Sequence, residues 1–169
     1  MKLEVAVLPF QGVAQRDLDH LAEDLAVLGV HAQVLAAVEV PDDAYEPPRR
    51  QYLADTLLRR ARRIGGDLPV LAVTDRDLYA EGLNFVFGLA ESPGRAAVIS
   101  LSRLRRHADD ATFRARAVKE AMHELGHTLG LRHCPDPACV MHFSNSLADT
   151  DRKGKTLCLR CRAQRLLPA

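Results

Sequence analysis

The chain has 169 residues, of which 47% are hydrophobic and 27% are charged, as in most soluble globular domains. A net charge of +1 argues against a protein dedicated to nucleic acid or to a membrane surface, and no apolar run is long enough to cross a bilayer. The apolar start of the chain lacks the basic flank and cleavage site of a secretion signal. We therefore expect a single, monomeric, cytoplasmic domain without a membrane partner.

Hydrophobic periodicity predicts alternating strands and helices over the first hundred residues. Strands are expected at residues 3–8, 30–38, 70–73, 84–89 and 96–101, helices at residues 18–28 and 53–64, and a loop at residues 41–48. Helical crossovers between the early strands favour a largely parallel sheet, and the closely spaced later strands allow one antiparallel pairing. The order β-α-β-α-β-β-β, followed by one more helix, predicts an α/β fold.

That last helix is predicted to begin at Asp109 or Asp110, either of which can cap its first turn, and to be ended by Gly130. Beyond Gly130, proline, cysteine and polar residues replace the periodic pattern. We expect an upper lobe over about residues 1–132 and a small, irregular C-terminal lobe over about residues 133–169.

The strongest chemical signal lies at the end of this helix. His123 and His127 are four positions apart, so both rings lie on one face and can bind one zinc ion. Gly130 can turn the chain and bring His133 up as a third ligand, which leaves a fourth position open, as in catalytic zinc sites. Glu124 is offset from the ligand face, where it can act as general base. The pattern predicts a zinc-dependent peptidase with peptide or protein substrates.

All four cysteines lie in the last quarter of the chain, at Cys134, Cys139, Cys158 and Cys161. In a reducing compartment this clustering predicts a closed structural zinc site of four thiolates, so that two zinc ions are expected per chain. Two disulfides or free thiols are the alternative. Because Cys134 directly follows His133, the structural zinc is expected to help position the third catalytic ligand.

The segment from His123 to His133 matches the metzincin motif, and Met141 stands where metzincins have the methionine of their Met-turn. The cysteine spacing, with Met141 two positions after Cys139, resembles that of the archaemetzincin family, as do upstream stretches such as residues 74–79. The resemblance implies a metzincin fold, with a mixed twisted sheet and helices in the upper lobe and a substrate cleft above the zinc-stabilised C-terminal lobe. It also implies that Met141 packs beneath the three histidines, and the family includes aminopeptidase-like activity.

The residues after Met141 differ from those of astacin-like metzincins. In that branch a tyrosine two positions after the methionine contacts the zinc site and assists the transition state. Phe143 stands at this position and has no hydroxyl. His142 and Asn145 are the nearest polar candidates to replace it.

A further hypothesis concerns the apolar run that precedes the Ser-Pro-Gly loop at residues 92–94. This run consists of Asn84, Phe85, Val86, Phe87, Gly88 and Leu89. We expect it to be the edge strand that lines the cleft, because the unpaired N–H and C=O groups of an edge strand can pair with an extended peptide substrate.

Two other functions are open from the sequence alone. From Asp151 onward the chain holds six basic residues against one acid, and Cys158–Cys161 resembles a zinc knuckle, so a nucleic-acid-binding module is one alternative. No aromatic residues interleave with these arginines, which argues against base stacking and favours an ordinary solvated basic surface. The missing tyrosine hydroxyl supports the other alternative, a peptide-binding zinc protein with little proteolytic activity.

Overall fold

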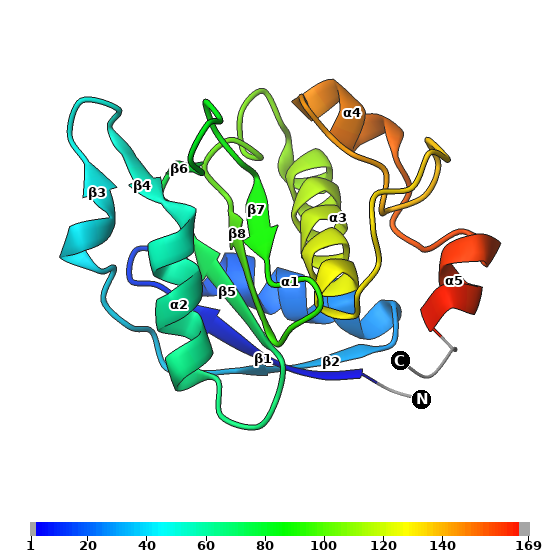
Figure 1. Ribbon diagram of the computed structural model, residues 1–169, viewed down its shortest axis with the longest axis horizontal. Helices are drawn as coiled ribbons and strands as arrows, with labels where there is room; N and C mark the ends of the chain where they lie inside the picture. Colours follow the sequence, from blue (N-terminus) through cyan, green and yellow to red (C-terminus); the bar gives the residue numbers. More distant parts are fainter. Residues whose placement is uncertain (1–2, 166–169) are drawn as a thin grey trace.

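The computed structural model describes residues 3–165 and places a five-stranded sheet at the centre of the molecule (Figure 1). Residues 1–2 and 166–169, which the expected lobes include, lie outside the described part. The sheet contains β1 (Leu3–Pro9), β2 (Val30–Val34), β5 (Val70–Thr74), β7 (Gly88–Ala90) and β8 (Ala96–Ser100), in the order β2-β1-β5-β8-β7. Neighbouring strands are parallel except β7, which runs antiparallel to β8 at one edge. The expectation of a mixed α/β sheet is confirmed.

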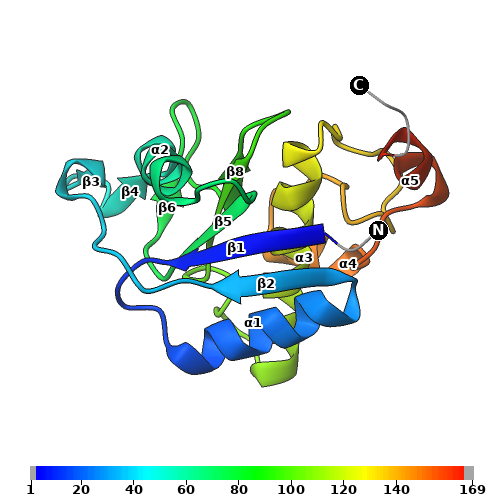
Figure 2. The same ribbon diagram turned by 90° about the horizontal axis from the view of Figure 1, so that it is seen from below.

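Three helices cover the two faces of this sheet (Figures 1 and 2). Helices α1 (Gln15–Val27) and α3 (Asp110–Thr128) pack on one face, and α2 (Ala54–Ile64) packs on the other. Side chains alternate along a strand, so successive residues of β5 and β8 belong to two separate hydrophobic clusters, one with α1 and α3 and the other with α2. Every residue of β5 and β8 is buried, as expected of strands covered on both faces.

A second, smaller sheet was not predicted. It consists of β3 (Tyr45–Glu46), β4 (Gln51–Leu53) and β6 (Leu78–Tyr79). The expectation of a plain loop at residues 41–48 is therefore wrong, because this segment holds β3 and the short helix η1 (Asp42–Ala44).

Two expected strands are shorter than their apolar runs. The run at residues 84–89 becomes a strand only at Gly88, and β7 then continues to Ala90. Before it, Val86 makes an isolated antiparallel bridge with Leu78 of β6, and Phe87 is buried in the core. The strand expected at residues 30–38 ends at Val34.

The C-terminal segment is irregular, as expected, apart from two short helices that the sequence did not predict. These are α4 (Leu147–Arg152) and α5 (Leu159–Arg165). A separate small hydrophobic cluster joins this segment to the end of α3, and its buried members are Leu131, Cys134, Cys139, Val140, Met141 and Cys161. Within residues 3–165, no helix is long and apolar enough to cross a membrane.

Candidate active site

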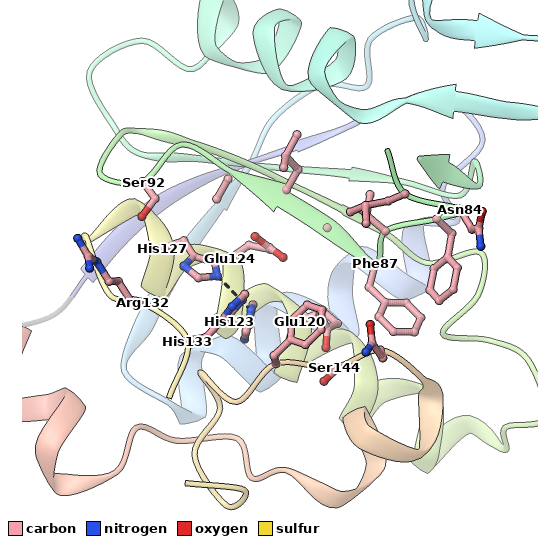
Figure 3. A pocket seen from close by; sticks show the side chains of 18 residues that line it. Asn84, Phe87, Ser92, Glu120, His123, Glu124, His127, Arg132, His133 and Ser144 are labelled. Atoms are coloured by element: carbon pink, nitrogen blue, oxygen red, sulfur yellow. Dashed lines mark hydrogen bonds between the residues drawn. The ribbon is translucent and has the colours of Figure 1, made fainter. Parts of the chain in front are cut away.

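Helix α3 presents His123, Glu124 and His127 to one side of the molecule (Figure 3). The helix begins at its expected cap, where the Asp109 carboxylate accepts a hydrogen bond of 2.8 Å from the N–H of Thr112. His123 and Glu124 are buried, with 5% and 6% of their surface exposed. A capped helix in the core thus holds all three side chains on a rigid element.

Gly130 redirects the chain after α3. Its φ of +83° lies in the left-handed region that favours glycine. Its N–H donates to the carbonyl of His127 (2.8 Å), and the N–H of Leu131 donates to the carbonyl of Gly126 (3.1 Å), which closes the helix end. The turn brings the ring of His133 to a centroid distance of 5.0 Å from the ring of His127.

The three histidine rings converge, and the ring nitrogens that could bind a metal point toward one another. Nδ1 of His123 lies 2.8 Å from the Val140 carbonyl and Nδ1 of His127 lies 2.7 Å from the Leu131 carbonyl. Because a carbonyl only accepts, each Nδ1 carries the proton and each Nε2 keeps its lone pair. The two Nε2 atoms are 3.1 Å apart (dashed line in Figure 3), close to the roughly 3.3 Å between two nitrogen ligands of a tetrahedral zinc. With His133, the three rings offer nitrogens within 4.8 Å of one another, a donor set that fits zinc.

The protonation of these histidines also suits metal binding. Burial, and after it the ammonium of Lys153, lowers the pKa of His123 to about 3. Burial is likewise the largest cause of the lowered pKa of His127 and of His133. The imidazoles are therefore held in the neutral form that binds metals.

Glu124 lies against the edge strand. A Cβ added at Gly88 of β7 would come within 2.7 Å of both Cγ and Oε1 of Glu124, so the absence of a side chain at Gly88 makes room for the carboxyl group. Burial, followed by the neighbouring carboxylate of Glu120, raises the pKa of Glu124 well above its ordinary range. A raised pKa makes a carboxylate a better proton acceptor near neutral pH.

Met141 packs beneath the histidines because Gly126 has no side chain in its way, a role for Gly126 that was not predicted from the sequence. Met141 is fully buried, and a Cβ at Gly126 would lie 2.3 Å from its sulfur. Gly126 lies in α3 between His123 and His127, so the methionine side chain can pack directly on the helix backbone there. The available signal was the glycine itself, because an isolated glycine inside a helix usually has a packing reason.

The four cysteines form a second compact group. Their sulfur atoms lie within 4.8 Å of one another, and Sγ of Cys134 is 3.8 Å from Sγ of Cys158. A tetrahedral four-thiolate zinc site requires a sulfur separation of about 3.8 Å. None of the four is in a disulfide. A backbone N–H from Cys161 lowers the pKa of the Cys158 thiol to about 7, whereas burial raises the pKa of the Cys139 and Cys161 thiols, so Cys158 is the member of the group that most readily forms the thiolate that metals bind.

A short strip of backbone connects the two groups. Cys139 belongs to the sulfur cluster, Val140 accepts the hydrogen bond from His123, and Met141 accepts one of 2.9 Å from the N–H of Cys134. Nδ1 of His142 lies 2.9 Å from the carbonyl of Cys134, so this ring supports the strip. His142 does not line the cleft.

The histidines open into a cleft of about 660 Å³ (Figure 3). One rim is formed by residues 83–90, which include β7, and the opposite rim by residues 143–145. The ring of Phe143 packs on the ring of His133 at a centroid distance of 4.9 Å, and Asn145 also lines the cleft. The run at residues 84–89 thus lies along the cleft, although only its end is a strand.

Sequence reasoning missed a buried ion pair next to His123. Nζ of Lys153 lies 3.0 Å from Oε1 of Glu120, and Glu120 lines the cleft. The expectation that the basic residues from Arg152 onward form a solvated surface is wrong for Lys153, whose side chain is fully buried. The only sequence signal was the position of Glu120, one helical turn before Glu124.

Comparison with known proteins identifies the family. A family model described as peptidase family M54 matches residues 23–166. The chain belongs to this family. The archaemetzincin of Methanopyrus kandleri is 47% identical over 150 residues, which cover 88% of this chain and 83% of that protein. The archaemetzincin of Pyrococcus furiosus is 40% identical and covers 95% and 91%.

Solved archaemetzincin structures share the fold. The crystal structure from Methanopyrus kandleri matches with a TM-score of 0.88 at 41% identity and covers 97% of this chain and 93% of that one. The Archaeoglobus fulgidus archaemetzincin, in complex with malonate, matches with a TM-score of 0.86 at 40% identity and covers 97% and 100%. The resemblance to archaemetzincins and the metzincin-like fold are confirmed, and this member of peptidase family M54 is a zinc-dependent metallopeptidase.

Proposed function

We propose that His123, His127 and His133 hold the catalytic zinc of this peptidase and that Glu124 is its general base. The observation that carries the proposal is the convergence of unprotonated ring nitrogens, with two Nε2 atoms 3.1 Å apart, beside a buried carboxyl group. Zinc bound there would polarise the scissile carbonyl and acidify a water molecule. Glu124 accepts the proton of the attacking water and then donates it to the departing amine.

The register of β7 supports substrate binding along this edge. Leu89 lies opposite Val98. Two residues before it, the Phe87 carbonyl accepts a hydrogen bond from Ser100 N–H (2.8 Å), and two residues after it, Glu91 N–H donates to the Ala96 carbonyl (3.0 Å), so every second residue bonds toward β8. In an antiparallel pair the residues between such positions turn their N–H and C=O groups away from the partner strand. We therefore propose that the backbones of Gly88 and Ala90 bind the substrate main chain, with up to four hydrogen bonds.

The cysteine group supports a second, structural zinc. We propose that Cys134, Cys139, Cys158 and Cys161 bind it, because their sulfur separations suit a closed tetrahedral site. On this view the chain is a single catalytic domain, with lobes at about residues 1–132 and 133–169. A monomer suffices, because every proposed site residue comes from one chain, and zinc-binding thiolates that form no disulfide suit a reducing compartment such as the cytoplasm.

The test of the catalytic assignment compares two variants in zinc-replete protein. Glu124→Gln keeps the shape of the side chain and all three imidazoles, so it should retain two zinc ions and the wild-type unfolding midpoint while losing turnover by about 10²–10⁴-fold. His127→Ala should lose one zinc ion per chain and activity together. Near-wild-type turnover of Glu124→Gln, measured on a peptide library by mass spectrometry, would show that Glu124 is not the base.

Aminopeptidase-like trimming is the finer form of this proposal. The same library, prepared with free and with acetylated α-amino groups, tests it. Trimming from the N-terminus requires that acetylation abolish cleavage, whereas internal cleavage continues on acetylated peptides.

A further inference from the structure

The ion pair between Lys153 and Glu120 is buried to an extent that demands a reason. The side chains are 0% and 4% exposed. Burying two charges costs several kcal/mol per ion before their attraction is counted, and apolar residues of similar volume often stabilise a fold as well or better. A contribution to stability alone therefore explains this pair poorly.

Contacts other than this pair also attach α4 to α3. Arg116 of α3 donates two hydrogen bonds of 2.7 Å to Asp151. Lys119 of α3 donates hydrogen bonds of 2.9 Å to the carbonyls of Thr150 and Asp151. These contacts already attach the C-terminal segment to the helix.

The position of the pair points to the metal site instead. Glu120 precedes His123 by three residues, lines the cleft, and lies beside His123 and Glu124 in Figure 3. Nζ of Lys153 is 3.4 Å from Nδ1 of His123 and 3.5 Å from the carbonyl of His142. The ammonium group therefore lies behind His123, on the side of the ring away from the metal-binding nitrogen.

At this position the carboxylate of Glu120 could itself bind the metal. A carboxylate is a good zinc ligand, and one that lies close to an open coordination position can occupy it. Yet among residues 3–165 the metal-binding group around His123 contains three histidines and no carboxylate. The contacts of Glu120 are with Lys153 (3.0 Å) and with the hydroxyl of Thr150 (3.4 Å), both from the C-terminal segment.

We propose that Lys153 is a positioning residue that holds the carboxylate of Glu120 away from the metal-binding nitrogens and so keeps the open position free for water and substrate. The inference rests on the histidine ligand set proposed above. It assigns the buried charge of Lys153 a role in the reaction, exerted through Glu120, in addition to its packing.

The experiment measures zinc affinity by chelator competition, turnover of a peptide substrate, and the visible spectrum after cobalt replaces the exchangeable zinc. The variants are Lys153→Met and the double variant Glu120→Gln/Lys153→Met. Lys119→Met is the matched control, because it removes another buried lysine that links α3 to α4 but that bonds only to carbonyls. Lys153→Gln is the conservative variant, because its amide can still donate to Glu120, and it should therefore keep the wild-type spectrum.

The proposal predicts opposite signs for affinity and activity. In Lys153→Met the released carboxylate joins the metal, so zinc binds at least as tightly, the cobalt spectrum changes, and kcat falls by about 10–100-fold. In the double variant the amide is a poor ligand, so the wild-type spectrum returns and kcat recovers to within a few-fold. Lys119→Met should change neither the spectrum nor kcat.

Three results separate the ideas. Looser zinc binding with an unaltered cobalt spectrum in Lys153→Met means that the pair only packs, and overturns the inference. A double variant whose spectrum stays abnormal overturns it too. If His127→Ala leaves the cobalt spectrum of the otherwise wild-type protein unchanged, the proposed ligand set itself is wrong, which is a different failure.

Discussion

Gly126→Ala tests whether Met141 supports the catalytic histidines by direct contact with α3. Helix propensity alone predicts that alanine at this helical position stabilises the protein by about 1 kcal/mol. The structure predicts the opposite sign. The added Cβ would lie 2.3 Å from the sulfur of Met141, whereas ordinary contacts are about 3.5–4.0 Å, so the sulfur must move by more than about 1 Å.

That movement has little room. Met141 is 0% exposed, and its carbonyl is bonded to Cys134 N–H at 2.9 Å. Overpacking of this kind costs about 1–3 kcal/mol, so after the propensity gain of about 1 kcal/mol we expect a net loss of up to about 2 kcal/mol. The strain should also reach the carbonyl of Val140, which holds His123, and weaken zinc binding by about tenfold.

Urea unfolding and chelator competition measure the two effects. The control is Met141→Ala, alone and combined with Gly126→Ala. Without the sulfur, the new methyl group fills part of the space left behind, so the double variant should be more stable than Met141→Ala alone. If Gly126→Ala shows the full gain of about 1 kcal/mol that helix propensity predicts, the packing argument is refuted.

Three further predictions concern the site. In Gly88→Ala the new Cβ would collide with Glu124 and with the Val98 carbonyl at 2.8 Å, and no side-chain rotamer relieves the contact with a backbone atom. We expect kcat to fall by about 100-fold while the zinc content stays unchanged, as measured by turnover and metal analysis. In metal-free protein, the pKa of His123 is 6.5 in the unfolded chain and about 3 in the folded chain, so between these pH values the unfolded chain binds one more proton. The free energy of unfolding should therefore fall as pH drops through this window, by at most about 1.4 kcal/mol per pH unit. The His123→Asn variant should lose this pH dependence. A chelator titration that follows zinc, activity and melting temperature should remove activity first and reversibly, because the closed cysteine site holds its metal more tightly than the open histidine site; a melting temperature that falls with the first zinc lost would contradict this order.

The catalytic helix was predictable because its constraints are local. The spacing of His123 and His127 determines their common face, and Asp109 and Gly130 mark the ends with residues whose backbone roles are specific. The sheet order was less accessible, because the pairing of β1 with β5 joins residues more than sixty positions apart.

The errors have physical causes at long range. The run at residues 84–89 has the composition of a strand, but the carbonyl of Asn84 accepts hydrogen bonds from Gln51 (2.9 Å) and Arg49 (3.3 Å), which hold the start of the run at the smaller sheet instead. Lys153 sits in a polar segment and reads as a surface residue, because its partner Glu120 lies 33 positions earlier. A single sequence does not show which distant charges meet.

The strip from Cys139 to His142 affects how the results of a mutational scan of this protein should be interpreted. The carbonyl of Val140 bonds to His123, a proposed zinc ligand, and its neighbour Cys139 belongs to the sulfur group. If the proposed zinc sites are correct, we expect that replacing a cysteine abolishes turnover as thoroughly as replacing one of the three histidines, although no cysteine lines the cleft. An activity assay alone would not distinguish the cysteines from the histidines. Metal content measured separately at each site would distinguish a residue that takes part in the reaction from one that only holds the reacting residues in position.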